Sequence, residues 1–306
     1  MTPITWRRWL PEFVLLALVW GASFLFTREA VLGFGPFATA WGRVTLGALV
    51  LTPLLWWRNE TRTLRQHWRS FVVMGLLNSG IPFACYAYAL LSISTGLSSI
   101  LNATTPLFGA VIAWRWLGDR LQGRQLLGLG LGFAGVVALA SGATGGIAVL
   151  PKIGSGLAVA ACLLATFCYG LAGSYSKRHL QGVSALAIAT GSLWGASIGL
   201  LLPALWQWPT TLPDLRAWSA LSAVGLLCTA LAYVLYFRLM SLTGPARTLT
   251  VTYLIPVFAN LLGVLVLGEV VSAWMLGCGA VILLGTALSS GLLTLRAKAA
   301  HSSRRG

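Results

Sequence analysis

Long apolar stretches alternate with short polar connections along the whole chain. Ten stretches approach the length of about 20 mostly apolar residues that a helix needs to cross a bilayer. The connections between them are rich in Gly, Pro, Ser and Arg and leave no room for a soluble domain. The pattern predicts an all-α polytopic membrane protein with ten transmembrane helices, over residues 13–32, 37–57, 71–91, 95–117, 125–143, 153–175, 183–206, 217–240, 246–267 and 271–293.

The composition excludes a soluble globular protein. Apolar residues make up 57% of the 306 residues and charged residues only 9%, whereas soluble domains carry about 25% charge. The formal net charge of +15 comes from basic clusters between the apolar stretches, which suits an anionic membrane surface better than a nucleic acid. The five cysteines all lie in apolar stretches without CxxC spacing, so no disulfide, metal site or cofactor is predicted.

The distribution of Lys and Arg predicts the orientation in the membrane. One set of alternate connections, with the two ends of the chain, holds 17 of these residues and the other set holds 3. Since basic residues accumulate on the cytoplasmic side, both termini are expected in the cytoplasm. The first apolar stretch lacks an Ala-x-Ala cleavage site and is interpreted as a retained span, not a signal peptide.

An internal repeat relates the two halves of the chain. Five helices per repeat is an odd number, so the halves must be inverted in the membrane, as in many transporters. We predict a first five-helix repeat over residues 1–145, a second, inverted one over 146–296 and a cytoplasmic tail over 297–306. A shift of 150 residues superposes, among others, Gly75-Leu76-Leu77 on Gly225-Leu226-Leu227, Tyr86 on Tyr236, Pro106 on Pro256, and Gly118-Asp119 on Gly268-Glu269.

Short motifs in both halves resemble a known family. Trp20-Gly21-Ala22-Ser23-Phe24 in the first predicted helix and Pro256, Gly263 and Gly268-Glu269 in the ninth are similar to the drug/metabolite transporter superfamily, in its ten-helix EamA-type members. Within this family, the motifs resemble the YddG-type aromatic amino acid exporters. The resemblance implies two inverted five-helix halves around a central cavity, in a bacterial inner membrane. Asp119 stands where the family's first repeat often has Glu.

Polar and aromatic residues form stripes on the predicted helices, and such stripes locate a polar path through a membrane protein. Each residue could instead hydrogen-bond one helix to another. Stripes matched in both halves favour a substrate-binding cavity. The candidate binding residues are Trp20, Ser23, Arg43, Asn78, Tyr86, Ser98, Asn102, Thr105, Tyr169, Trp194, Tyr233, Tyr236 and Thr252.

Several of these residues have two interpretations. Arg43 either binds a substrate carboxylate or extends its charge to the membrane surface. Trp20 and Trp194 lie far from the predicted span ends, where they either stack on a substrate or fill the core. Pro106 and Pro256 kink their helices or serve as hinges of alternating access. Asp119 and Glu269 are expected to end their helices, with Asp119 in a capping box.

The predicted spans contain no acid, Lys or His near their centres, so a buried proton relay has no carriers. Uncoupled transport of neutral and aromatic amino acids, by export through alternating access, is the favoured function. A multidrug or other metabolite exporter is the alternative, and a non-transporting receptor or scaffold is the alternative from another class. Enzyme motifs are missing from the spans. A nucleotide-sugar substrate is disfavoured, because its phosphates would need several cationic residues in the cavity and only Arg43 is available. The protein is expected to be a monomer.

Overall fold

The computed structural model describes residues 6–145 and 155–290, and all regular structure in these two ranges is helical. The first range holds α1 (Trp6–Trp57), α2 (Thr61–Gln66), α3 (Trp68–Gly75), η1 (Leu76–Gly80), α4 (Ile81–Ala89), α5 (Thr95–Asn102), α6 (Thr105–Ile112), η2 (Ala113–Leu117) and α7 (Gly123–Gly145). The second range holds α8 (Ser155–His179), α9 (Ala185–Trp206), α10 (Leu215–Gly225), η3 (Leu226–Leu231), α11 (Ala232–Thr243), α12 (Pro245–Leu249), η4 (Thr250–Tyr253), α13 (Ile255–Leu267) and α14 (Ala273–Ser289).

These helices give the predicted ten membrane crossings. Among the described residues, eight continuous helices are long and apolar enough to span a bilayer. The first of them, α1, crosses twice because it folds back at Gly35, and α14 adds a crossing of 17 residues. Gly35 has φ 72° and ψ 171°, a conformation that only glycine adopts without strain. Pro36 then starts the second leg of α1, where its missing N–H costs nothing.

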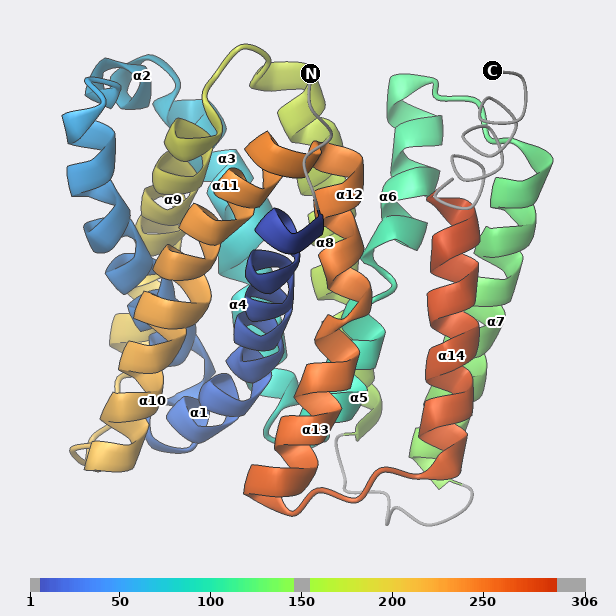
Figure 1. Cartoon of the computed structure of the whole chain (residues 1–306). Helices are drawn as coiled ribbons and strands as arrows, with labels where there is room; N and C mark the ends of the chain where they lie inside the picture. The colour runs from blue at the N-terminus through green and yellow to red at the C-terminus, as the bar shows by residue number, and fades with distance from the viewer. Residues whose placement is uncertain (1–5, 146–154, 291–306) are drawn as a thin grey trace.

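The two halves run in opposite directions through the membrane. Figure 1 shows the first leg of α1 descending, while α8, which begins the second half, ascends. The same reversal relates α3 and α4 to α10 and α11, α5 and α6 to α12 and α13, and α7 to α14 (Figure 1). The fold is therefore two inverted five-helix repeats, as predicted. The predicted boundary between residues 145 and 146 falls at the edge of a segment, 146–154, that lies outside the described residues, as does the tail.

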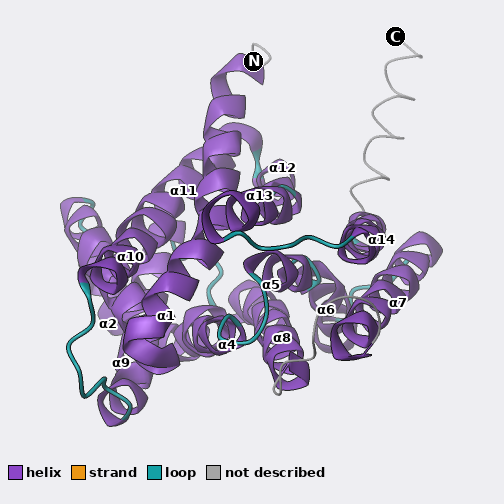
Figure 2. Ribbon diagram, turned by 90° about the horizontal axis from the view of Figure 1, so that it is seen from below, coloured by secondary structure: helices purple, strands orange, loops and turns teal. Residues whose placement is uncertain are grey.

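The fifth helix of each half packs against the other at one edge of the molecule. Seen along the bundle, α7 and α14 lie side by side and apart from α1 and α11 (Figure 2). A Cβ atom added at Gly128 would lie 2.5 Å from the backbone nitrogen of Ser289, and one at Gly285 would overlap the backbone of Gly132. Glycines thus let the two backbones approach closely, as in other membrane helix pairs that pack through small residues.

Candidate substrate-binding site

The third helix of each half contains a π-helical segment at the same position. η1 begins at Leu76 and η3 begins at Leu226, which are 150 residues apart. In η3 the hydroxyl of Thr229 donates a hydrogen bond to the carbonyl of Val224, five residues earlier, at 2.9 Å. Such widened turns occur frequently at functional sites. The two π-helical segments occupy matched positions in the two halves, and both face the centre of the molecule. This match indicates the centre as the region of a functional site.

Arg43 extends into this central region from the second leg of α1. It is the eighth residue of that leg from Pro36, or about 10 Å along the helix. Its Nε donates a 3.0 Å hydrogen bond to Thr229 Oγ1, and its guanidinium carbon lies 3.7 Å from the centre of the Phe83 ring. Arg43 is 8% exposed, so its charge stays inside the protein and does not extend to the membrane surface.

No acidic side chain of the chain neutralises Arg43. Glu12 pairs with Arg238, Glu29 with Arg216, Asp119 with Lys177, and Glu269 with Arg28. Glu60 accepts a hydrogen bond from Ser184, and Asp214 accepts one from the backbone of Ala217. These six are all the acidic residues in the sequence. The central arginine is therefore a buried charge without an internal counter-charge.

A chain of contacts links Arg43 to aromatic and amide side chains of both halves. Tyr169 and Tyr233 are its electrostatic neighbours. The Tyr233 hydroxyl accepts a 3.2 Å hydrogen bond from Asn78, and the Tyr86 hydroxyl donates a 2.9 Å bond to Asn102. We call the following eight residues the central cluster: Trp20, Arg43, Asn78, Tyr86, Asn102, Tyr169, Tyr233 and Tyr236.

Ring contacts connect the rest of the central cluster. The rings of Tyr86 and Tyr169 are stacked with centroids 6.3 Å apart, and those of Trp20 and Tyr236 lie 5.5 Å apart. Tyr233 and Tyr236 both contact the ring of Phe237. Each of these links except the Tyr86–Asn102 bond and the Phe237 contacts joins one half to the other. The cluster is thus aromatic, polar and placed where the two inverted halves meet.

The other five candidate residues lie outside the central cluster. The hydroxyls of Ser23, Thr105 and Thr252 donate to backbone carbonyls three residues earlier in the chain, at 2.6–2.8 Å. Trp194 donates to Thr52 at 2.9 Å and thereby joins α9 to α1. Ser98 lies 4.0 Å from the sulfur of Cys162. The contacts of Trp194 and Ser98 favour the alternative in which such residues hold one helix to another, whereas the other three hydroxyls bond locally to the backbone.

The structure adds residues that were not among the candidates. Thr229 and Phe83 hold the guanidinium of Arg43, and Phe24 packs edge-on against Tyr86 with ring centroids 5.6 Å apart. The repeated Gly-Leu-Leu triplet marks the start of both π-helical segments, and it was the available signal for Thr229. Phe24 and Phe83 carry no comparable signal, because a phenylalanine in an apolar helix resembles any core residue.

The fourth helix of each half is interrupted near its centre. α5 ends at Asn102 and α6 begins at Thr105, one residue before Pro106; likewise η4 ends at Tyr253 and α13 begins at Ile255, one residue before Pro256. Proline occupies the first turn of the new helix in both cases, where it needs no N–H partner. The prolines therefore mark matching breaks in the two halves. A hinge function at these breaks stays a prediction.

Two close helix crossings are also matched between the halves. Gly21 of α1 meets Phe258 and Ala259 of α13, and Gly170 of α8 meets the backbone of Phe108 and Gly109 in α6. An added Cβ would lie 2.6 Å from Phe258 Cβ at the first crossing and 2.8 Å from the Gly109 nitrogen at the second. Glycine is therefore needed at the two points where α1 crosses α13 and α8 crosses α6.

An ion pair closes each of these crossings at one end, and the two pairs differ in burial. Arg28 Nη1 lies 2.5 Å from Glu269 Oε1, with side-chain exposures of 31% and 8%. Glu269 also accepts hydrogen bonds from the backbone N–H and the hydroxyl of Thr95, at 2.7–3.0 Å. It therefore caps α5 of the other half. We call this group the buried latch.

The equivalent pair at the opposite end is exposed. Lys177 Nζ lies 3.1 Å from Asp119 Oδ2, and both side chains are more than half exposed. The predicted capping box is wrong, because α7 begins only at Gly123 and the N–H of Gln122 donates instead to Gln125 Oε1. We call Lys177 and Asp119 the exposed pair.

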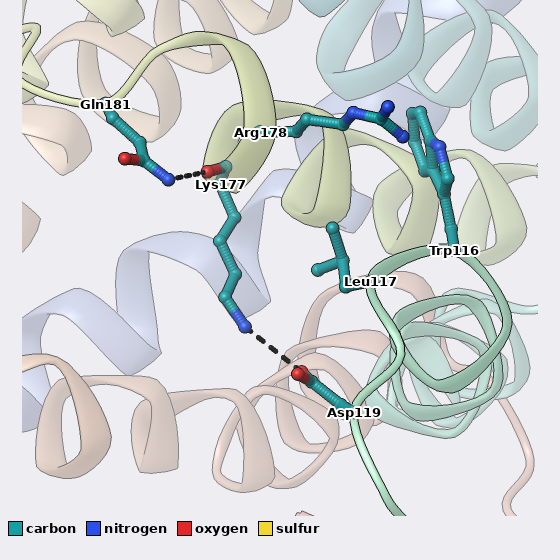
Figure 3. A pocket seen from close by; sticks show the side chains of 6 residues that line it. All are labelled: Trp116, Leu117, Asp119, Lys177, Arg178 and Gln181. Atoms are coloured by element: carbon teal, nitrogen blue, oxygen red, sulfur yellow. Dashed lines mark hydrogen bonds and ion pairs between the residues drawn. The ribbon is translucent and has the colours of Figure 1, made fainter.

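An open hollow of about 530 Å³ surrounds the exposed pair. Figure 3 shows Lys177 extending across it toward Asp119, with Arg178 directed at the ring of Trp116. Leu117 and Gln181 complete the lining. The hollow is lined by residues of both halves, at the end of the molecule where α2 lies (Figure 1). At the opposite end, the buried latch joins the two halves.

A protein-family model matches the sequence of each half separately. The EamA-like transporter family matches residues 8–141 and again residues 156–291. The chain belongs to this family of the drug/metabolite transporter superfamily. It is accordingly a multi-pass membrane transporter of small molecules, and not an enzyme.

Individual relatives agree with this assignment at low identity. The chain is 25% identical to the uncharacterized transporter YvbV of Bacillus subtilis, over 80% of this chain and 79% of that one. It is 24% identical to the uncharacterized inner membrane transporter YedA of Escherichia coli, over 87% and 86%. It is 25% identical to a protein of Streptantibioticus cattleyicolor named a probable terminal-alkyne amino-acid exporter, over 84% of each chain. A solved crystal structure superposes with a TM-score of 0.65 at 22% identity, over 94% of this chain and 97% of that one.

Proposed function

We propose that this transporter exports neutral and aromatic α-amino acids. The observation that carries the proposal is the central cluster, in which rings, amides and hydroxyls from both halves converge around one positive charge. Aromatic rings suit a flat or apolar side chain, and amide and hydroxyl groups suit the polar ends of a zwitterion. A relative with similar coverage is named an amino-acid exporter. A multidrug exporter of cations fits less well, because Arg43 would repel a positive substrate.

Transport is proposed to be uncoupled from protons. The six acidic residues lie at helix ends or in connections, and none belongs to the central cluster. Of the three histidines in the sequence, His67 lies in a connection, His179 is the last residue of α8, and position 301 falls in the predicted tail. A proton relay through the membrane needs titratable groups along the path. Net export would then follow from a higher concentration of substrate inside the cell.

Alternating access between the two inverted halves is the proposed mechanism. The buried latch and the exposed pair occupy equivalent positions in the repeat, so exchanging their states would move the opening from one face to the other. Under this mechanism, one access state has the latch closed and the hollow at the exposed pair open, and this interpretation is supported by the ion pair at one end and the hollow at the other. The excess of Lys and Arg on the side of the exposed pair favours that side, with both termini, as cytoplasmic. The latch would then face outward, from a monomer in a bacterial inner membrane.

Reconstitution tests the proposal directly. Purified protein in liposomes should exchange labelled phenylalanine or another neutral amino acid for the same compound trapped inside, while empty liposomes should not. The panel should include nucleosides and a cationic drug such as ethidium. Exchange of nucleosides or ethidium, but of no amino acid, would overturn amino-acid export. Absence of exchange for every compound tested would show that the substrate belongs to none of the classes in the panel.

A further inference from the structure

Arg43 is an unusual residue for a membrane protein interior. Its residue exposure is 8%, and no carboxylate among the described residues lies within 4 Å of it. A buried charge that lacks a partner strongly destabilises a protein, because the charge has lost its water without gaining a counter-charge. An arginine that stays buried between the two halves despite this loss of stability is suited to bind a ligand of opposite charge.

The hydrogen-bonding groups of Arg43 are arranged for such a partner. A guanidinium has five N–H donors in one plane, and only the Nε–H is committed, to Thr229. The Phe83 ring covers one face of the plane and, with Thr229, fixes its orientation. The terminal N–H groups therefore remain as a rigid fork, and this geometry matches the two oxygens of a carboxylate.

Tyr233 supplies a further donor near this fork. Its hydroxyl oxygen accepts a hydrogen bond from Asn78 and also lies beside the Ser79 hydroxyl, so its own O–H can donate either to Ser79 or to a bound ligand. Asn78 belongs to η1, and Thr229, which orients Arg43, belongs to η3. Each π-helical segment thus positions one donor of the other half: η3 holds Arg43 through Thr229, and η1 holds Tyr233 through Asn78.

We propose that Arg43 and Tyr233 form a carboxylate-binding site for the transported molecule, with Thr229 and Asn78 as positioning residues. The proposal rests on the proposed function and extends it, because it assigns the part of the substrate that binds. The substrate class is then α-amino acids and related carboxylates, and amines without a carboxylate are excluded.

Two analogues of phenylalanine test this assignment without a mutation. 3-Phenylpropionate keeps the carboxylate and lacks the amine, and 2-phenylethylamine keeps the amine and lacks the carboxylate. 3-Phenylpropionate should compete with phenylalanine exchange and raise the melting temperature of the detergent-purified protein, while 2-phenylethylamine should do neither. Equal competition by both compounds would overturn the carboxylate site. The melting measurement reads carboxylate binding even if phenylalanine exchange itself fails, so the two proposals fail separately.

Variants at Arg43 separate binding from structure. Arg43→Met should raise the KM for phenylalanine about 10- to 100-fold, because charge-assisted hydrogen bonds are lost. It should also keep or raise the melting temperature of the ligand-free protein, because an unpaired buried charge is removed. Arg43→Lys should recover part of the affinity. A structural arginine would behave in the opposite way, with a lower melting temperature and an unchanged preference between the two analogues.

Two controls complete the test. Thr45→Val lies two residues along the same helix and removes a hydroxyl that contacts Ser197 at 2.7 Å, so it should leave the preference for 3-phenylpropionate intact. Replacing chloride by sulfate should not change KM. If chloride removal abolished exchange, and the melting temperature responded to chloride but not to 3-phenylpropionate, Arg43 would be a halide site and the proposal would be wrong.

Discussion

The buried latch is expected to set the balance between the two access states. The Glu269 side chain is 8% exposed and pairs with Arg28. Its carboxylate also accepts hydrogen bonds from Thr95, whose backbone N–H is shared between the two oxygens and whose hydroxyl donates to one of them. Hydrogen bonds to a charged group contribute about 1.5–3 kcal/mol each, and Glu269→Gln keeps one accepting oxygen. We therefore expect a loss of about 2 kcal/mol from the latched state, which is about a 30-fold change in the ratio of the two states.

The exposed pair supplies the matched control. Asp119 and Lys177 are 53% and 60% exposed, and exposed ion pairs contribute at most about 1 kcal/mol because water and salt screen them. Asp119→Asn should therefore change the same ratio no more than about fivefold. The repeat makes the two substitutions equivalent in position, so the difference between them isolates the effect of burial.

Distances between spin labels measure the ratio. In a variant without the native cysteines, labels at Leu32 and Val270 report the latch side, and labels at Arg120 and Gln181 report the side of the exposed pair. Glu269→Gln should widen the first distance and narrow the second. An unchanged distribution on the latch side, or widening on both sides, would refute the latch. A lower melting temperature without any change of distance would assign Glu269 to stability alone.

Three further predictions concern the site and the mechanism. Trp20→Ala and Asn102→Ala should each lower exchange at least several-fold with normal yield and elution, whereas Thr252→Val, whose hydroxyl donates only to the nearby carbonyl of Leu249, should exchange as wild type; unchanged exchange in the first two would place the site elsewhere. A neutral amino acid should equilibrate without concentrating under an imposed pH gradient, and accumulation driven by that gradient would show proton coupling. Pro256→Ala restores a backbone donor at the helix break and should slow turnover more than it changes binding, which single-turnover and steady-state rates distinguish.

The membrane architecture could be predicted from the sequence because lipid imposes strong rules. Every crossing must be a long apolar helix, so each of the ten spans appears in the sequence as a long apolar stretch. The repeat was detectable because the matched prolines and the Gly-acid pairs kept their spacing across 150 residues. Arg43 was noticeable for the same reason, since any charge within a span requires an explanation.

The details of the site were not predictable from residue type and spacing. Helical stripes show which side chains share a face, but they do not show which face meets the other half. Trp194 and Ser98 share a stripe with polar neighbours and nevertheless contact adjacent helices. The buried latch joins residues 241 positions apart, and neither member indicates its partner. The π-helical segments change the register of the third helix in each half, which a regular period of 3.6 residues does not represent.

The glycine seam between α7 and α14 has a consequence for biogenesis. α7 is synthesised with the first half, whereas α14 follows at the end of the chain. Until α14 is inserted, the bare backbone around Gly128 and Gly132 has lipid or an unrelated helix as its neighbour. The glycine surface of α7 therefore stays uncovered while residues 146–272 are synthesised, and a chain truncated before α14 would present this surface to membrane proteases or to a second copy of itself.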